Sequence, residues 1–217
     1  MTKFLLLPLA LLGAAQPAHA RAGDILLRGR AIVVAPQEES SGISPAFPGE
    51  KVKVSDYYAP EVDVTYMVAD HVGLELIAAT TRHKVSGRTG TTGSIGRLAS
   101  SWVLPPTLTL QYHFAPGARV RPYVGAGVNY TLFYKEKASR GLEAAVGETD
   151  VRLKNSLGAT VQAGVDFDLG TNLFLNLDAK WIDMDTTARL STTAAGVQRV
   201  KVHLDPLVFG VGIGTRF

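Results

Sequence analysis

The feature that most constrains this chain is the alternation of apolar and polar residues along most of its length. It is clearest over residues 156–167, where the odd positions are apolar and the even positions carry Ser, Gly, Thr, Gln and Asp. Successive side chains of a β-strand point to opposite faces, so this period predicts strands with one apolar face. The pattern predicts eight strands, over residues 24–35, 61–68, 72–82, 102–114, 120–134, 155–167, 173–184 and 200–217.

The connections between these segments alternate in length. Residues 69–71, 115–119 and 168–172 form short turns in which Gly, Pro, Asn and Asp are frequent, whereas residues 36–60, 83–101, 135–154 and 185–199 form long connections. An up-and-down meander places all short turns at one end and all long loops at the other, as in outer-membrane barrels. The sequence therefore predicts an all-β fold, an eight-stranded antiparallel up-and-down transmembrane β-barrel of the outer membrane.

The alternation alone also fits a water-soluble barrel whose apolar face points inward. Two features favour the inverted arrangement, with the apolar face toward lipid. The polar faces of the fourth to sixth strands are rich in Gly, Ser, Thr, Gln and Asn and, apart from Asp166, small and uncharged, which suits a narrow lumen better than a solvent-facing surface. Aromatic residues also lie at strand ends on the apolar face, as in interfacial girdles: Tyr112, Phe114, Phe167, Trp181, Phe209 and Phe217.

The first 20 residues have the pattern of a cleaved signal peptide. Lys3 precedes an apolar run over residues 4–15, and Ala18 and Ala20 supply small residues before the expected cleavage at Arg21. A buried N-terminal helix is the alternative, and Pro8 disfavours it. The apolar run has 12 residues, whereas a membrane-spanning helix needs about 20. We expect an exported chain with one barrel domain over residues 21–217, located in the cell outer membrane.

The C-terminal strand ends the chain on an aromatic residue. Its outward positions alternate with Gly210, Gly212 and Gly214 and resemble the signal read by the barrel-insertion machinery of the outer membrane. The alternative is an ordinary last strand that happens to end in Phe. The residues of this expected assembly signal are Phe209, Val211, Ile213 and Phe217.

Familiar catalytic and cofactor motifs do not occur in this sequence. There is no Cys, and the five His residues lack metal-ligand spacing. The glycine-rich residues 87–94 lack the Gly-Lys-Ser/Thr ending of a phosphate loop and a predicted helix after it, so we expect a flexible surface loop. No G-x-S-x-G elbow occurs. The net charge of +3 is spread along the chain, which argues against nucleic-acid binding. We expect a protein that is not an enzyme and that uses no metal or cofactor.

The inward faces of the predicted strands divide the lumen into two zones. The middle zone carries charges of both signs that must pair in a narrow lumen, and we expect a plug made of Arg28, Arg30, Glu75, Asp178 and Lys180. The zone nearer the long loops is apolar, which is unexpected in a water-filled pore. It predicts either a pocket open to the outside or simple packing of a closed barrel, formed by Ile32, Val34, Phe133, Ile182 and Met184.

One long connection, residues 83–101, is basic. It carries Lys84, Arg88 and Arg97 and no acidic residue. Cations near an anionic membrane surface are attracted to its headgroups. The connection therefore either contacts phosphates of outer-leaflet lipopolysaccharide or is simply solvated.

Four stretches of the sequence resemble the outer membrane protein W family. They are Gly23-Asp24, residues 104–114 (LPPTLTLQYHF), residues 121–131 (RPYVGAGVNYT) and residues 205–217 (DPLVFGVGIGTRF). Thr215 departs from the pattern, because such strands more often carry an aromatic residue there. The resemblance implies an eight-stranded barrel with a narrow apolar channel, linked to uptake or efflux of small hydrophobic molecules.

Two functions follow from these expectations. The first is porin-like passage of small hydrophobic solutes through the apolar end of the lumen, with sideways exit into outer-membrane lipid because the charged zone blocks the straight path. The second is a closed structural or interaction barrel whose extracellular loops bind envelope components, phage or host surfaces.

Overall fold

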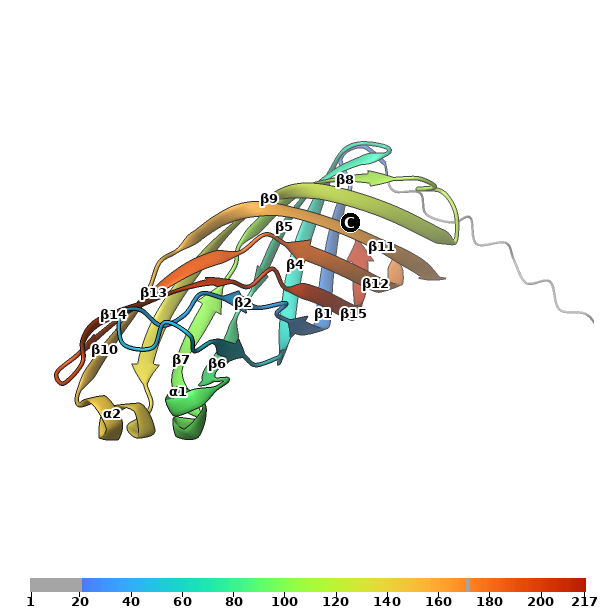
Figure 1. Cartoon of the computed structure of the whole chain (residues 1–217). Coiled ribbons are helices and arrows are strands. Elements are labelled where there is room, and N and C mark those ends of the chain that lie inside the picture. Colours follow the sequence, from blue (N-terminus) through green and yellow to red (C-terminus); the bar gives the residue numbers. More distant parts are fainter. Residues whose placement is uncertain (1–20, 171) are drawn as a thin grey trace, which may run out of the picture.

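The computed structural model describes residues 21–170 and 172–217, and its core is a closed antiparallel β-barrel (Figure 1). Neighbouring strands pair in sequence order, and the pairing of β9 with β11 closes the ring. The predicted eight-stranded up-and-down barrel is therefore confirmed. The expected signal peptide, residues 1–20, lies outside the described residues. The barrel strands are β1 (Ile25–Ala35), β4 (Tyr57–Ala69), β5 (Val72–Ala79), β8 (Thr107–His113), β9 (Val120–Ala138), β11 (Ser156–Gly170), β12 (Leu173–Ile182) and β15 (Leu207–Arg216).

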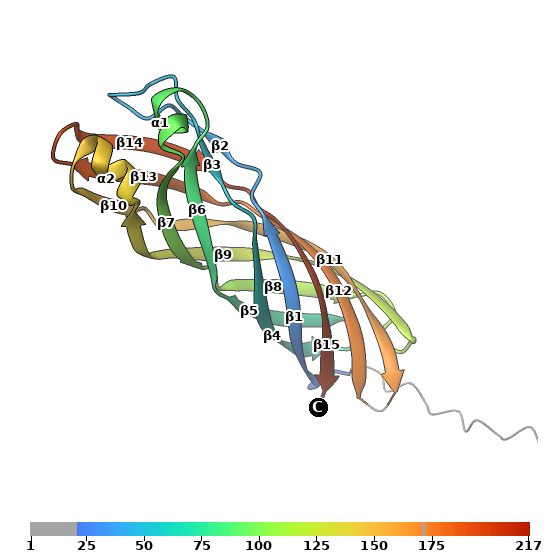
Figure 2. The same cartoon turned by 90° about the horizontal axis from the view of Figure 1, so that it is seen from below.

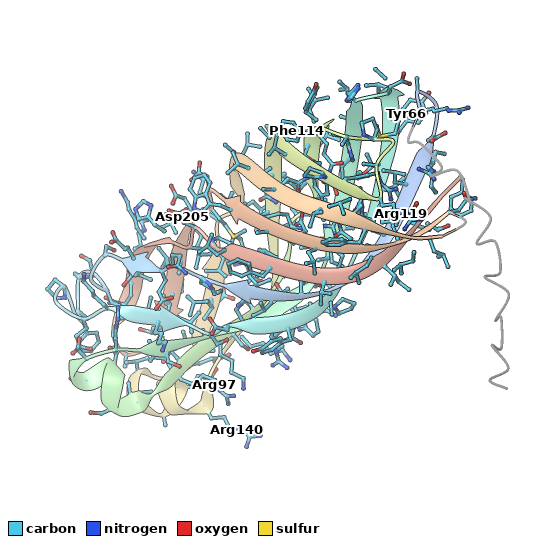
Figure 3. All side chains as sticks on the ribbon, turned by 90° about the vertical axis from the view of Figure 1, so that its right-hand side faces the viewer. Tyr66, Arg97, Phe114, Arg119, Arg140 and Asp205 are labelled. Atoms are coloured by element: carbon cyan, nitrogen blue, oxygen red, sulfur yellow. The ribbon has the colours of Figure 1, made fainter. Side chains whose placement is uncertain are left out.

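The outer surface of the barrel is apolar, as the inverted arrangement predicts. Leu110, Leu157 and Ile213 expose 56%, 74% and 63% of their surface, whereas the alternate positions of their strands are buried or half-buried. Aromatic side chains flank the short-turn end of this band. Tyr112 and Phe114 meet edge to face with ring centroids 5.3 Å apart, and Figure 3 shows Tyr66, Phe114 and Arg119 at this end of the barrel.

Two corrections concern the long connections, which are more ordered than predicted. They continue the barrel wall as a second tier of strands beyond the barrel's outer end (Figures 1 and 2). Residues 87–94 include the start of a short helix, so the expected flexible loop is wrong. The elements of this extension are β2 (Glu39–Ser40), β3 (Val52–Val54), β6 (Thr81–Gly87), α1 (Gly90–Ile95), β7 (Arg97–Leu104), α2 (Arg140–Val146), β10 (Thr149–Leu153), β13 (Asp185–Thr192) and β14 (Gly196–His203).

The extension and the barrel meet at breaks inside three of the predicted strands. The predicted strand 72–82 divides at Thr80, and the strand 102–114 divides at Pro105 and Pro106. Proline has no N–H to donate to a β-ladder, so the two prolines interrupt the pairing. The predicted strand 200–217 divides next to Pro206, and the predicted strand 173–184 ends at Ile182, before β13 begins at Asp185.

No helix among the described residues is long and apolar enough to cross a membrane.

Candidate functional site

The lumen is the candidate site, and its middle is filled by two buried arginines of β1. Arg28 donates from Nη1 to Asp63 Oδ1 at 2.9 Å and to Thr65 Oγ1 at 2.8 Å. Its Nη2 reaches Asp166 Oδ2 at 3.2 Å on the opposite side of the barrel. Asp63 lies directly across from Arg28 in the β1–β4 register. The first arginine therefore ties two walls of the barrel together.

Arg30 makes the second set of contacts, one step higher on the same face of β1. Its Nη1 donates to Glu61 Oε1 at 2.8 Å, and its Nη2 lies 2.8 Å from Asp63 Oδ2 and 3.1 Å from Glu75 Oε1. Its Nε donates to Asn176 Oδ1 at 2.7 Å. The guanidinium fork thus contacts side chains from three other strands.

Lys180 of β12 completes the cluster. Its Nζ lies 2.7 Å from Glu61 Oε1 and 2.9 Å from Asp178 Oδ1. The structure therefore brings all five residues of the predicted plug into one buried network, together with Glu61, Asp63 and Asp166, which we call the plug. Charges that are buried this deeply persist only when they are paired and hydrogen-bonded.

The predicted plug left out Glu61, Asp63 and Asp166, as well as Tyr123, which contacts the plug. Asp166 and Tyr123 both face the lumen, and the Tyr123 hydroxyl donates to Asp178 Oδ2 at 2.8 Å. Strand parity could have found both of them, because Asp166 follows Gln162 and Gly164 on the polar face of β11 and Tyr123 precedes Gly125 and Gly127 on β9.

Glycines of the facing strands make room for the plug. Gly212 and Gly214 of β15 lie opposite Arg30 and Arg28 in the register. A side chain at Gly212 would collide with the backbone oxygen of Gly29, and one at Gly214 would collide with the Phe174 ring. The alternation of glycine in the last strand therefore has a packing role inside the barrel.

Above the plug lies an apolar cavity of about 80 Å³. All five residues of the predicted pocket line it and are buried: Ile32, Val34, Phe133, Ile182 and Met184. Its floor is formed by Glu61 and Lys180 of the plug. The extension adds apolar residues that the sequence analysis did not assign to the pocket, among them Leu153, Val202 and Leu204.

A single histidine lies in the wall of the pocket, above the barrel. His83 of β6 contacts the Ser55 carbonyl oxygen through Nδ1 at 2.7 Å and Thr81 Oγ1 through Nε2 at 3.0 Å. Burial lowers the pKa of this imidazole below its usual 6.5. The ring is therefore neutral at neutral pH, which suits an apolar wall.

Three carboxylates gather at the junction between barrel and extension. One carboxylate oxygen from each of Asp183, Asp185 and Asp205 lies within 4.8 Å of the others. Local contacts account for two of them: Asp205 Oδ1 accepts from the Met184 amide at 3.0 Å, and Asp185 Oδ1 lies 2.6 Å from His203 Nδ1. Figure 3 shows Asp205 between the two tiers.

The predicted assembly signal lies on the outer surface of the last strand. Phe209, Val211 and Ile213 each expose half or more of their surface, and Phe217 follows β15 with 71% exposed. The Phe217 amide donates to the Ile25 carbonyl oxygen at 2.9 Å, so the two ends of the barrel domain are bonded to each other.

Comparison with known proteins agrees with this architecture. A model of the OmpW family matches residues 21–217. Outer membrane protein W of Escherichia coli is 37% identical over 199 residues, covering 90% of this chain and 89% of the relative. An uncharacterized outer-membrane protein of Sinorhizobium fredii is 34% identical over 195 residues, covering 89% of this chain and 79% of the relative.

A solved structure is also similar over nearly the whole chain. The crystal structure of OprG from Pseudomonas aeruginosa superposes with a TM-score of 0.86 at 33% identity, covering 92% of this chain and 98% of that one. The lipid-facing barrel, the family match and these relatives lead to one conclusion: this chain is an outer-membrane β-barrel that belongs to the OmpW family.

Proposed function

We propose that this barrel passes small hydrophobic molecules across the outer membrane, through the apolar pocket and then sideways into the bilayer. The observation that carries the proposal is the apolar cavity above a closed, charged floor. Apolar surface that enters such a pocket gains about 25 cal/mol per Å² removed from water. No chemical step on the solute is involved.

The plug supports a sideways path rather than a straight one. An apolar solute that moved down the lumen would have to separate Arg30 from Glu61 and Glu75, and removing a partner from a buried charge is costly. The solute also offers no hydrogen bond in return. We therefore infer that the solute leaves above the plug.

The wall beside Pro105 and Pro106 is the exit that we propose. The β5–β8 ladder ends at Ile77↔Thr107, and the β6–β7 ladder begins at Thr81↔Val103. Between these pairs the prolines donate no backbone hydrogen bond. Pro105 also lines the pocket, so this gap in the ladder lies at the height of the cavity.

The test of this proposal is solute flux into liposomes that contain the purified barrel. We expect an apolar solute to enter faster than into empty liposomes, while a hydrophilic solute of equal size is excluded. Replacing Pro105 and Pro106 by Val restores two N–H donors and should slow the flux while pocket binding is kept. Flux equal to that of empty liposomes would instead favour a closed barrel whose extracellular tier binds envelope components, phage or host surfaces.

The partners in this proposal are apolar solutes, outer-leaflet lipopolysaccharide and the barrel-insertion machinery. For the machinery, the exposed row ending at Phe217 supports the proposed assembly signal. Phe217→Asp should lower the amount of folded barrel in the outer membrane more than Phe209→Ala, because Phe217 ends the chain. Equal membrane levels of the two variants would argue against a terminal signal.

A further inference from the structure

A basic groove lies on the outward face of the extracellular tier, on the side away from the pocket. It runs between β6, β7, the end of β9 and the start of α2. Five cationic side chains line it, and no carboxylate among the described residues does. Figure 3 shows Arg97 and Arg140 together at this end of the molecule. The groove cations are Arg82, Lys84, Arg97, Lys137 and Arg140.

The strand register sets the direction in which this groove faces. Residues paired across antiparallel strands share a face of the sheet. Lys84 pairs with Ser100, and Ser100 pairs with Lys137, so the two lysines lie in one row across three strands. Thr81 and His83, on the opposite face of β6, line the apolar pocket. The row of lysines therefore faces outward.

The neighbouring row toward the barrel is aromatic. Arg82 pairs with Trp102, and Trp102 pairs with Tyr134. The two rings stack with centroids 6.3 Å apart, and the Arg82 guanidinium carbon lies 6.0 Å from the centre of the Trp102 ring. Rings of this kind mark the level of the lipid headgroups in outer-membrane barrels.

The outward side chains of β9 show the same succession along one strand. Val128 and Tyr130 are about half exposed in the apolar band, Tyr134 follows, and Lys137 comes next. Apolar, aromatic and cationic side chains thus follow one another along β9. Acyl chains, the interface and phosphates follow one another in the same order across a leaflet.

Within residues 21–170 and 172–217, no carboxylate forms an ion pair with a groove cation. The exposed ion pairs lie elsewhere, such as Arg152–Asp150 and His203–Asp185 in the four-stranded sheet that contains β10, β13 and β14. Like charges that gather without a counter-charge repel one another unless an anion lies between them. This arrangement suits an anionic ligand that is supplied by the membrane.

We propose that this groove binds the phosphate groups of a phosphorylated glycolipid, the lipid A part of lipopolysaccharide, in the outer leaflet around the barrel. Lys84 and Arg97 come from the basic connection identified in the sequence, and β9 and α2 contribute Lys137 and Arg140. Arg88 of the same connection does not line the groove. The inference rests on the outer-membrane placement of the barrel and does not depend on what the pocket carries.

The test uses Trp102, in the row beside the groove, as a reporter. The chain has two tryptophans, so Trp181→Phe leaves Trp102 as the single tryptophan, which can be excited selectively. The purified barrel, in nanodiscs of zwitterionic lipid, is titrated with diphosphoryl lipid A and with the same lipid after removal of its phosphates. We expect saturable binding of the first and at least about tenfold weaker binding of the second, because charge-assisted contacts to phosphate are lost.

Two triple variants locate the effect. Lys84→Gln, Arg97→Gln and Lys137→Gln together should weaken binding of diphosphoryl lipid A about tenfold or more. The matched control removes three exposed cations from β13 and β14, Arg189→Gln, Arg199→Gln and Lys201→Gln, and should leave binding within about twofold of the parent. Lys84→Arg with Lys137→Arg should bind as the parent does.

Three results would overturn the proposal. They are equal binding of the phosphorylated and dephosphorylated lipids, an unchanged affinity in the groove triple variant, and an equal loss in the control triple variant. Competition by inorganic pyrophosphate as strong as that by lipid A would also count against a site for membrane lipid. Solute flux through the pocket is not part of this measurement, so the two proposals can fail separately.

Discussion

The lower and upper halves of the lumen share one barrel wall but have opposite contents. The change takes one inward step along each of three strands: Arg30 to Ile32 on β1, Glu75 to Ile77 on β5 and Lys180 to Ile182 on β12. Below this level, charged groups from opposite walls bond to one another; above it, apolar side chains surround a cavity. Alternation thus fixes which residues face inward, whereas the residue types at each level decide whether the lumen is filled or left open.

The largest expected effect comes from breaking the lower half. Arg30→Ala removes the shared partner of Glu61, Asp63 and Glu75 and leaves Arg28 and Lys180 as the only cations against the five carboxylates of the plug. Removing one partner from such a buried ionic network costs about 3–5 kcal/mol of unfolding free energy. We expect a lower urea midpoint in lipid and a higher ion conductance in planar bilayers, while apolar binding is kept. An unchanged conductance would show that Arg30 does not close the lumen.

A charge in the upper half of the lumen should have the opposite effect: weaker binding of apolar ligand with conductance unchanged. Ile182→Asp places a carboxylate in the apolar pocket, where any apolar ligand would desolvate it. We expect at least about a tenfold loss of affinity for an apolar probe, equivalent to about 1.4 kcal/mol, with low conductance kept. Heat-modifiable migration on gels is the control for folding. If the folded variant binds the probe as the parent does, the pocket does not bind solute.

Adding one methyl group beside the plug tests how tightly the lower half of the lumen is packed. Gly212→Ala drives a Cβ toward the Gly29 carbonyl oxygen beside Arg30, and overpacking of this kind costs about 1–3 kcal/mol of unfolding free energy. Gly29→Ala is the matched control, because nothing lies within 4 Å of its added Cβ. We expect urea unfolding to separate the two variants; equal midpoints would contradict a tightly filled lower lumen.

The smallest expected effect is a pH dependence of stability that arises from His83 in the upper half. The pKa of His83 is lower in the folded state than the usual 6.5, so the unfolded chain binds more protons below that pH. The contribution of neutral His83 to stability is complete above about pH 6.5 and declines as the pH falls below it. Unfolding midpoints measured from pH 7.5 to pH 5 should therefore fall less for His83→Gln than for the parent. Parallel curves would contradict this role of His83.

The barrel and the inward face of its strands could be predicted because long strands repeat one parity rule many times. Arg28, Arg30 and Ile32 share the inward face of β1, and no other element is needed to place them there. The same rule puts Asp166 on the polar face of β11, although the predicted plug does not include it. The alternation of inward and outward side chains is a local property of a strand, so it can be predicted from the sequence alone.

The partners of these side chains could not be predicted. The contact between Arg28 and Asp63 depends on the β1–β4 register, and the long connection between these strands does not fix a register as a tight turn does. The contact between Arg28 and Asp166 crosses the lumen and joins residues 138 positions apart. The extension was missed because its strands are short and lie largely within the long connections, where frequent Gly, Ser, Thr and Pro indicate loops. Where an extension strand adjoins a barrel strand, the alternation continues across Pro105, Pro106 and Pro206 and hides the break.

The central claim is that apolar solute binds above the plug and does not pass through it. NMR of the methyl-labelled barrel with an apolar ligand tests this most directly, because the lumen has apolar residues on both sides of the plug. Ile32, Ile182 and Met184 line the pocket, whereas Leu26 and Met67 form a separate buried cluster with Phe174. We predict nuclear Overhauser contacts from the ligand to the pocket methyls and none to Leu26 or Met67. Contacts to Leu26 and Met67 would show that the ligand crosses the plug and would contradict the account.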